Sequence, residues 1–248
     1  MKLIVLGSGT CLPSLQRNAP GYYLEAGGCR VIVDCGSGTL LQLEKAGKSY
    51  RDIDAVFITH THPDHFADLL PLIHALLVGQ EMKRGKDLSL FCPKEFLDYY
   101  EKAIAPVLWM SEGFSVITKE ATAEINFGPF HILSAKTVHS SDSISYRFEC
   151  GGKSVVFTGD ADYDQRLIAH AQKADLLIAD CSFPDSMKAK GHLSAKECGM
   201  VAREAEVKKL VLSHLYPAGS PDSERVKESG ENFNGDILLA EDLMEIVI

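Results

Sequence analysis

The sequence feature that most constrains the fold is the stretch ITHTHPDH at residues 58–65. It places three histidines and an aspartate directly after an apolar segment. That segment, IDAVFIT at 53–59, is rich in β-branched residues, which predicts a buried strand. Histidine is an uncommon residue, and a cluster of this kind at the end of a strand indicates a functional site.

The spacing within this stretch predicts metal ligands. Side chains alternate in an extended segment, so we expect His60 and His62 to point the same way. A turn at Pro63 would then direct Asp64 and His65 to a neighbouring point. Imidazole nitrogens and carboxylate oxygens are ligands that zinc takes. The stretch therefore predicts two adjacent metal sites with two ligands each.

Length and charge limit the function. A chain of 248 residues with 46% hydrophobic and 24% charged residues is typical of a globular protein, and we expect one domain spanning 1–248. The net charge of −9 argues against binding an extended nucleic acid, because such binding needs many cationic side chains. A small phosphorylated substrate in a local site remains compatible with this charge.

The seven cysteines are scattered, and no two of them form a CxxC pair. We interpret them as mostly reduced and buried, which favours a cytoplasmic protein. The start, MKLIVLGSGT, predicts a first strand and not a signal peptide, and no apolar stretch has the length of a membrane span.

Strand and helix patterns alternate along both halves of the chain. We expect strands at 2–7, 22–28, 29–36, 53–59, 87–93, 114–118, 123–126, 129–136, 143–160, 175–181 and 208–214. We expect helices at 37–47, after Asp68 as the capping residue, from about Lys94, near 162–172 and at 194–205, the last begun by a capping box of Ser194 and Glu197. Two β-rich layers covered outside by helices fit this order best.

Further candidate ligands lie at other strand ends. Three histidines stand where a strand ends or a loop meets a helix: His139, His192 and His214. Asp160 closes the apolar strand SVVFTGD in the same way. The other three histidines lie inside apparent helices or strands, and we interpret them as core or solvated residues: His74, His131 and His170.

These motifs together resemble the metallo-β-lactamase fold superfamily, and within it the ribonuclease Z-like, phosphodiesterase branch. The matching segments run nearly end to end: LGSGTCLPSLQRN, VDCGSGT, ITHTHPDHFADL, TVH, FTGD, GHLSA and LVLSH. The resemblance implies an α+β fold, a four-layer αββα sandwich of two mixed β-sheets flanked by helices. It places the metals at one edge of the two sheets, and it implies a possible homodimer.

The resemblance also implies a role for each matching position. One metal is held by His60, His62 and His139; the second is held by Asp64, His65 and His214; Asp160 bridges both. His192 matches a histidine that contacts the scissile phosphate, and Asp34 matches an acidic residue that supports the histidine loop. Five imidazoles and two carboxylates without a thiolate favour two zinc ions, with manganese or iron as alternatives.

Two departures from the tRNA-processing members stand out. Those members carry a long arm between the third histidine motif and the Gly-Asp motif, whereas here His139 and Asp160 leave room only for a hairpin. Leu15 stands where their P-x-K-x-R-N motif has lysine, and ADCSF at 179–183 replaces their HEAT.

We therefore expect a metal-dependent phosphodiesterase that acts on a small nucleotide or a short nucleic-acid end. A water between the metals would attack, Asp64 would orient that water or accept its proton, and His192 would stabilise the phosphoryl oxygens or protonate the leaving oxygen. The alternatives are tRNA 3′ processing, hydrolysis of a lactone or thioester, and a non-catalytic metal-binding module.

Overall fold

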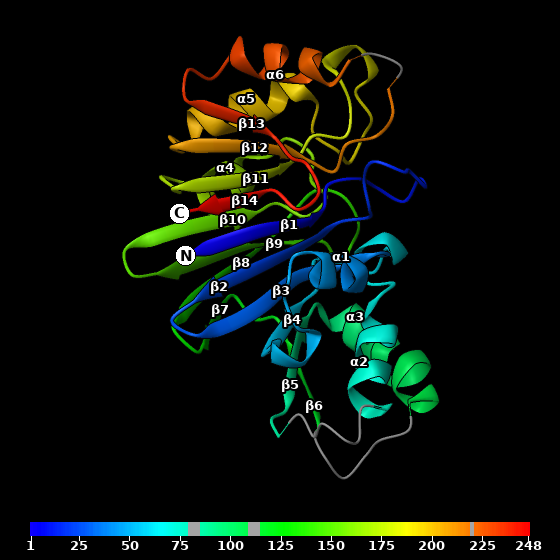
Figure 1. The fold of residues 1–248 in the computed structure, drawn as a ribbon. Coiled ribbons are helices and arrows are strands. Elements are labelled where there is room, and N and C mark those ends of the chain that lie inside the picture. Colours follow the sequence, from blue (N-terminus) through cyan, green and yellow to red (C-terminus); the bar gives the residue numbers. More distant parts are fainter. Residues whose placement is uncertain (79–84, 109–114, 219–220) are drawn as a thin grey trace.

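Two β-sheets packed face to face, with helices on both outer faces, make up the protein in a computed structural model (Figure 1). The structure describes residues 1–78, 85–108, 115–218 and 221–248. Each sheet contains seven strands in these ranges. The predicted four-layer αββα sandwich of two mixed sheets is therefore confirmed.

The first sheet is built by the N-terminal part of the chain and closed by its last strand. Its spatial order is β14 (Glu245–Val247), β1 (Lys2–Gly7), β2 (Gly21–Ala26), β3 (Cys29–Cys35), β4 (Ala55–Phe57), β5 (Leu88–Cys92) and β6 (Val116–Glu120). Strands β14 to β3 pair antiparallel, and β3 to β6 pair parallel.

The second sheet follows the same plan. Its spatial order is β13 (Asp236–Leu239), β12 (Lys209–Ser213), β11 (Leu176–Asp180), β10 (Lys153–Phe157), β9 (Ile144–Cys150), β8 (Phe130–Lys136) and β7 (Glu124–Phe127). Strands β10 to β13 pair parallel, and β7 to β10 pair antiparallel. Parallel strands end at a common edge, so the loops after β10, β11 and β12 lie together.

Six α-helices cover the sheets in the described residues. Those on the first sheet are α1 (Thr39–Lys45), α2 (Leu69–Val78) and α3 (Lys94–Tyr99); those on the second are α4 (Gln165–His170), α5 (Ala195–Glu204) and α6 (Asp222–Gly230) (Figure 1). Within 1–78, 85–108, 115–218 and 221–248, none of them combines the length and the apolar composition that crossing a bilayer demands.

Alternation along the strands explains the layers. In β1, Leu3 and Val5 face the second sheet, whereas Ile4 and Leu6 face the helices. Both faces are buried, so the strand reads as a continuous apolar run.

The predicted strands and helices match the structure closely up to residue 214, with three qualifications. β4 is shorter than the predicted strand, the segment 143–160 forms two paired strands, β9 and β10, and residue 114 lies outside the described residues. The capping box of Ser194 and Glu197 at α5 is confirmed. The elements α6, β13 and β14 were not predicted.

The expected role of Asp68 as the cap of its own helix was wrong. Its carboxylate accepts hydrogen bonds from the backbone N–H groups of Gly38 at 3.1 Å and Leu40 at 3.0 Å, at the start of α1. The residue that precedes α2 thus caps a neighbouring helix and joins the two.

The three histidines interpreted as core or solvated residues lie outside the histidine clusters. His74 is exposed on α2, and His131 is paired with Glu124 and Glu149 on the surface. His170, at the end of α4, has a buried Nε2 atom without a hydrogen-bond partner. Burial, with the nearby charge of Arg147, lowers the pKa of His170 to about 4.

We predict that His170 makes the fold sensitive to acid. Its pKa in the folded chain lies below the value of about 6.5 expected in the unfolded chain, so the unfolded chain takes up the proton first as the pH falls. The stability that depends on neutral His170 is complete above pH 6.5 and is lost between pH 6.5 and 4, by about 2–3 kcal/mol. Urea unfolding of the metal-free protein at pH 7 and 4.5 should show a smaller loss for His170→Gln than for the wild type. His74→Gln is the control, and an equal loss in both variants would contradict the prediction.

Candidate metal centre

The candidate ligands come from loops at one edge of the two sheets. His60 and His62 follow β4, His139 follows β8, Asp160 follows β10, and His214 directly follows β12. Gly159, with φ of +58°, brings the end of β10 against the first sheet, where a Cβ atom would lie 2.9 Å from the Cβ atom of Thr59. The backbone N–H of Ile144 donates to the Thr59 carbonyl at 3.0 Å and joins the two sheets here.

Two residues of this edge have a left-handed backbone although they are not glycine. Asp34 has φ of 55° and His214 has φ of 57°. The pairing of β2 with β3 shifts register at Gly21, so Asp34 is the extra residue of a bulge, and its carboxylate points into the histidine loop. Such backbone strain at a strand end is typical of functional sites.

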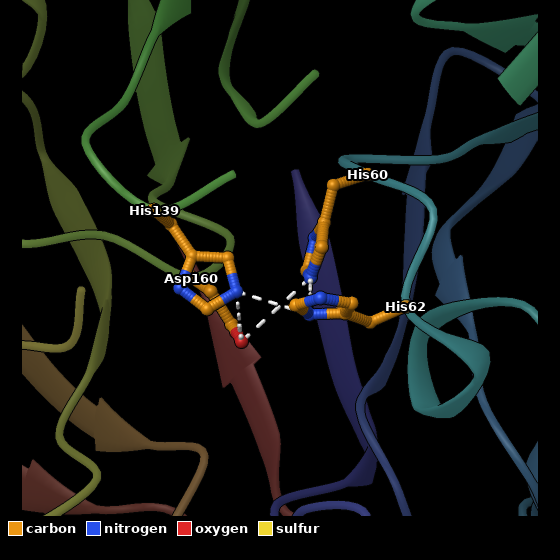
Figure 2. Close-up of side chains that lie close together, drawn as sticks. All are labelled: His60, His62, His139 and Asp160. Carbon is orange, nitrogen blue, oxygen red and sulfur yellow. Dashed lines mark hydrogen bonds and ion pairs between the residues drawn. The ribbon is translucent and has the colours of Figure 1, made fainter. Parts of the chain in front are cut away.

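One group of four side chains surrounds a point between the sheets (Figure 2). His62 Nδ1 lies 3.0 Å from His60 Nε2 and 3.0 Å from His139 Nε2. Oδ2 of Asp160 lies 3.7 Å from His60 Nε2 and 3.4 Å from His139 Nε2. Three imidazole nitrogens and one carboxylate oxygen converge here, the donor set that a divalent metal takes.

A second group lies on the other side of the same carboxylate. Oδ1 of Asp160 lies 3.1 Å from His65 Nε2 and 3.2 Å from His214 Nε2, and Oδ2 of Asp64 lies 3.8 Å and 3.6 Å from the same two nitrogens. Asp160 Oδ1, His65 Nε2 and His214 Nε2 are buried and have no hydrogen-bond partner. Buried polar atoms are rarely left unpaired, so these three fit a bound cation.

The hydrogen bonds of the first sheet's histidines leave the ring nitrogens that face this centre available to a metal. His65 Nδ1 lies 2.8 Å from Asp34 Oδ2 and donates a proton there, so Nε2 is the nitrogen that a metal would bind. The Thr59 hydroxyl donates to Asp34 at 2.9 Å and therefore accepts from His60 Nδ1 at 3.0 Å. Such partners orient metal-binding imidazoles and fix their tautomer.

The histidines of the second sheet are also oriented by hydrogen bonds at Nδ1. His139 Nδ1 donates to the Gly191 carbonyl at 2.9 Å. The Ser182 hydroxyl donates to Asp180 Oδ1 at 2.6 Å and accepts from His214 Nδ1 at 3.1 Å. In both histidines Nε2 faces Asp160 and is the nitrogen that a metal would bind.

The charges in the centre shift the pKa values strongly. Burial alone would raise the pKa of Asp160, but the facing His214 and His65 outweigh it and hold this pKa well below its usual range. Burial would lower the pKa of His65, yet Asp160 and Asp34 raise it well above its usual value. Protons on the histidines therefore balance Asp160 in the free protein, and a divalent cation would displace them on binding.

His192 and Asp180 form a pair beside the two groups. His192 Nδ1 lies 2.8 Å from Asp180 Oδ2 and 3.8 Å from Asp160 Oδ2. Burial would lower the pKa of His192, but the hydrogen bond to Asp180 and its charge raise it. Asp180 was not predicted as a site residue, although its place at the end of the apolar strand DLLIAD was the same signal that pointed to Asp160.

The fold and the two His/Asp groups together define a metal-dependent hydrolase of the metallo-β-lactamase fold. Residues 29–215 match the model of the Beta-lactamase superfamily domain, and the chain belongs to this family.

Similar proteins include a probable metallo-hydrolase and a ribonuclease Z. The chain is 32% identical over 244 residues to the probable metallo-hydrolase YhfI of Bacillus subtilis, with 97% of each chain covered. The crystal structure of that protein has a TM-score of 0.87, at 29% identity and with 99% and 98% of the chains covered. Ribonuclease Z of Archaeoglobus fulgidus is 27% identical over 308 positions, with 100% and 97% covered. Human tRNase Z, short form, shares the fold, with a TM-score of 0.81, 22% identity, and 100% and 99% covered.

We predict two divalent ions per chain, one for each group of ligands. Removing them leaves the buried atoms of Asp160, His65 and His214 unpaired, so chelation should lower the melting temperature. The loss in the free energy of unfolding should be about 4 kcal/mol relative to protein with free metal at about 1,000 times Kd. Elemental analysis and thermal unfolding with and without EDTA measure both effects. One ion per chain, or an unchanged melting temperature, would contradict the two-ion assignment.

We predict that Asp34→Asn weakens metal binding by about 10- to 100-fold, because His65 and Thr59 lose the carboxylate that orients them. Asparagine tolerates the left-handed backbone of residue 34, so the bulge should survive. Competition against chelators of graded affinity measures the change. Asp175→Asn removes a half-buried carboxylate that binds Ser154 and Lys208 away from the site; it is the control and should keep wild-type affinity.

Proposed function

We propose that this protein is a phosphodiesterase that uses two divalent metal ions, most simply zinc, and cleaves a small nucleotide or a short nucleic-acid end. The observation that carries the proposal is the split carboxylate of Asp160, whose two oxygens face two different groups of histidines. Adjacent metal sites that share one carboxylate suit phosphate esters, because both the attacking and the leaving oxygen are then stabilised.

Seven side chains would hold the metals. In the proposal His60, His62 and His139 hold one, Asp64, His65 and His214 hold the other, and Asp160 belongs to both. Metals bound there would lower the pKa of a water and neutralise the phosphoryl charge. Asp64 is less buried than Asp160, and its carboxylate is in position to orient a water or accept its proton.

His192 would act on the leaving group and not as a ligand. Its Nδ1 is occupied by the hydrogen bond to Asp180, which leaves Nε2 to face the substrate. The raised pKa favours the protonated ring near neutral pH, as a general acid needs. Lys188 supports this loop, since its ammonium group donates to the His192 carbonyl and to Asp162, both at 2.5 Å.

A small substrate is supported by what lies between His139 and Asp160. The chain there forms only the hairpin of β9 and β10, joined by Gly151 and Gly152. The alignment with the Archaeoglobus enzyme spans 308 positions against 248 residues here, so that ribonuclease Z has about 60 residues without a counterpart. The net charge of −9 also disfavours a long polyanion.

Processing of the tRNA 3′ end is the second candidate function. It is favoured by the name of the Archaeoglobus relative, ribonuclease Z, which matches this chain over its whole length. The short hairpin and the acidic charge weigh against it.

We predict that the metal-loaded protein hydrolyses bis(p-nitrophenyl) phosphate, and that His192→Ala lowers kcat by about 10²- to 10⁴-fold. The metal content of this variant should stay at the wild-type level, because His192 is not a ligand in the proposal. Release of p-nitrophenol and elemental analysis of the same preparation measure both quantities.

His131→Ala is the matched control, since this histidine lies on the surface and pairs with Glu124 and Glu149. Loss of metal in His192→Ala would instead make His192 a ligand. Hydrolysis of thioester or lactone substrates in preference to the phosphodiester would overturn the proposed reaction.

A further inference from the structure

Two aromatic rings lie at the rim of the metal centre and take no part in holding the candidate metals. Phe183 follows β11, and Tyr216 lies two residues beyond His214. Their ring centroids are 4.9 Å apart and the planes are inclined by 19°, so the rings are stacked. Both residues are only half-buried. Stacked rings that remain partly open at a reaction centre are typical of a surface that receives another planar ring.

The pair is close to the histidines that would act on the substrate. The centroid of the Tyr216 ring lies 5.6 Å from that of His214 and 6.1 Å from that of His192. The base and the phosphate of one nucleotide could therefore lie against Tyr216 and at the centre at the same time.

The backbone holds both rings firmly. The N–H of Tyr216 donates to the Ser182 carbonyl at 3.2 Å. The buried guanidinium of Arg225 donates to the carbonyls of Tyr216 at 2.5 Å and Ser182 at 3.2 Å, and Asp222 holds this guanidinium at 2.6 Å. A platform fixed in this way loses little conformational freedom when it binds a ring.

Two adjoining cavities connect the platform to the centre. One, of about 400 Å³, is lined by Asp64 together with Thr10 and Leu12. The other, of about 510 Å³, is lined by Tyr216 and Pro217 and again by Thr10 and Leu12. Both volumes lie within the range of about 300–1,000 Å³ of small-molecule sites.

The loop after β1 lines both cavities and lies beside the segment that follows β12 (Figure 1). Cys11 Sγ of this loop is 3.3 Å from the Tyr216 hydroxyl, and Leu12 is 47% exposed. Arg17, which lines both cavities, is already paired with Asp222 at 2.9 Å. Acidic and hydroxyl side chains also line the cavity beside Tyr216, and its one cation is already paired, so the contact that the cavity offers a planar ring is stacking on the tyrosine and not attraction to a cation.

We propose that Tyr216 and Phe183 form a nucleobase subsite, in which the base next to the scissile phosphate stacks on Tyr216. This inference rests on the proposed phosphodiester chemistry for the position of the phosphate. The base subsite narrows the substrate class to nucleotides. Recognition would come from one base and not from a long sugar-phosphate backbone. The net charge of −9 is compatible with this, because stacking needs no charge.

Calorimetric titration of the zinc-loaded protein tests the subsite without relying on turnover. Adenosine 5′-monophosphate and ribose 5-phosphate differ only in the base, and we expect the nucleotide to bind about 10-fold more tightly. Tyr216→Leu should remove this advantage and leave the affinity for ribose 5-phosphate unchanged, whereas Tyr216→Phe should keep it. Phe183→Leu, which removes only the supporting ring, should reduce it. Metal content and melting temperature confirm that each variant is folded.

The outcomes separate the subsite from the proposed reaction. Equal affinity for the two phosphates in the wild type would overturn the subsite and leave the phosphodiesterase proposal standing. Hexyl phosphate binding as tightly as the nucleotide would also overturn it, since the site would then be apolar and not selective for a planar ring. Adenosine without phosphate should bind weakly and depend on Tyr216. A different result is that adenosine binds in this way while the phosphate group adds no affinity to either adenosine 5′-monophosphate or ribose 5-phosphate. That result would support the base subsite and contradict the proposed phosphodiester chemistry.

Discussion

The structure of the functional edge depends on one buried carboxylate, that of Asp160. Its Oδ2 lies 3.4 Å from His139 Nε2, and its Oδ1 lies 3.1 Å from His65 Nε2. A buried charge is tolerated only where opposite charge and polar groups surround it, so loops from both sheets have to converge on this point. Removing the compensating charge leaves Asp160 in an apolar sandwich at a cost of several kcal/mol. Metal binding and folding are therefore coupled here.

Two further carboxylates, one in each sheet, hold the histidines by the same arrangement. In the first sheet Asp34 binds His65 directly and His60 through the hydroxyl of Thr59. In the second sheet Asp180 binds His192 directly, and it reaches His214 through the hydroxyl of Ser182. Each carboxylate thus orients two rings. The hydroxyl that links the carboxylate to the second ring donates to the carboxylate and accepts from the ring. The difference lies in the ring bound directly: Nε2 of His65 faces Asp160 Oδ1 at 3.1 Å, whereas His192 lies beside the two groups, with its Nδ1 3.8 Å from Asp160 Oδ2.

Local patterns in the sequence were enough for most elements up to residue 214 and for most of the residues that converge at this edge, because a strand followed by His or Asp carries its own signal. The elements α6, β13 and β14 were not predicted. The αββα arrangement was predicted from the family resemblance that the motifs carry, because the periodicity of a strand does not indicate its pairing partner. Contacts between distant segments could not be foreseen. Asp68 precedes one helix and caps another, whose residue Gly38 is 30 positions away, and no local rule identifies that partner. Asp180 was missed because its partner His192 comes from a different loop, and only the fold brings the two side chains together.

At the edge of the second sheet, the residues of the proposed chemistry and those of the proposed base subsite form two layers. In the buried layer, with Asp160, His214 and Asp180, the side chains are oriented by hydrogen bonds such as the one from the Ser182 hydroxyl to Asp180. The outer layer, with Tyr216 and the loop after β1, is half-buried and borders open cavities. Tyr216 follows His214 by two residues, and Arg225 donates a hydrogen bond to its carbonyl. The position of the outer layer therefore depends on that of the inner layer. Under the proposed function, substitutions in the outer layer would therefore change which base is bound without moving the side chains of the inner layer.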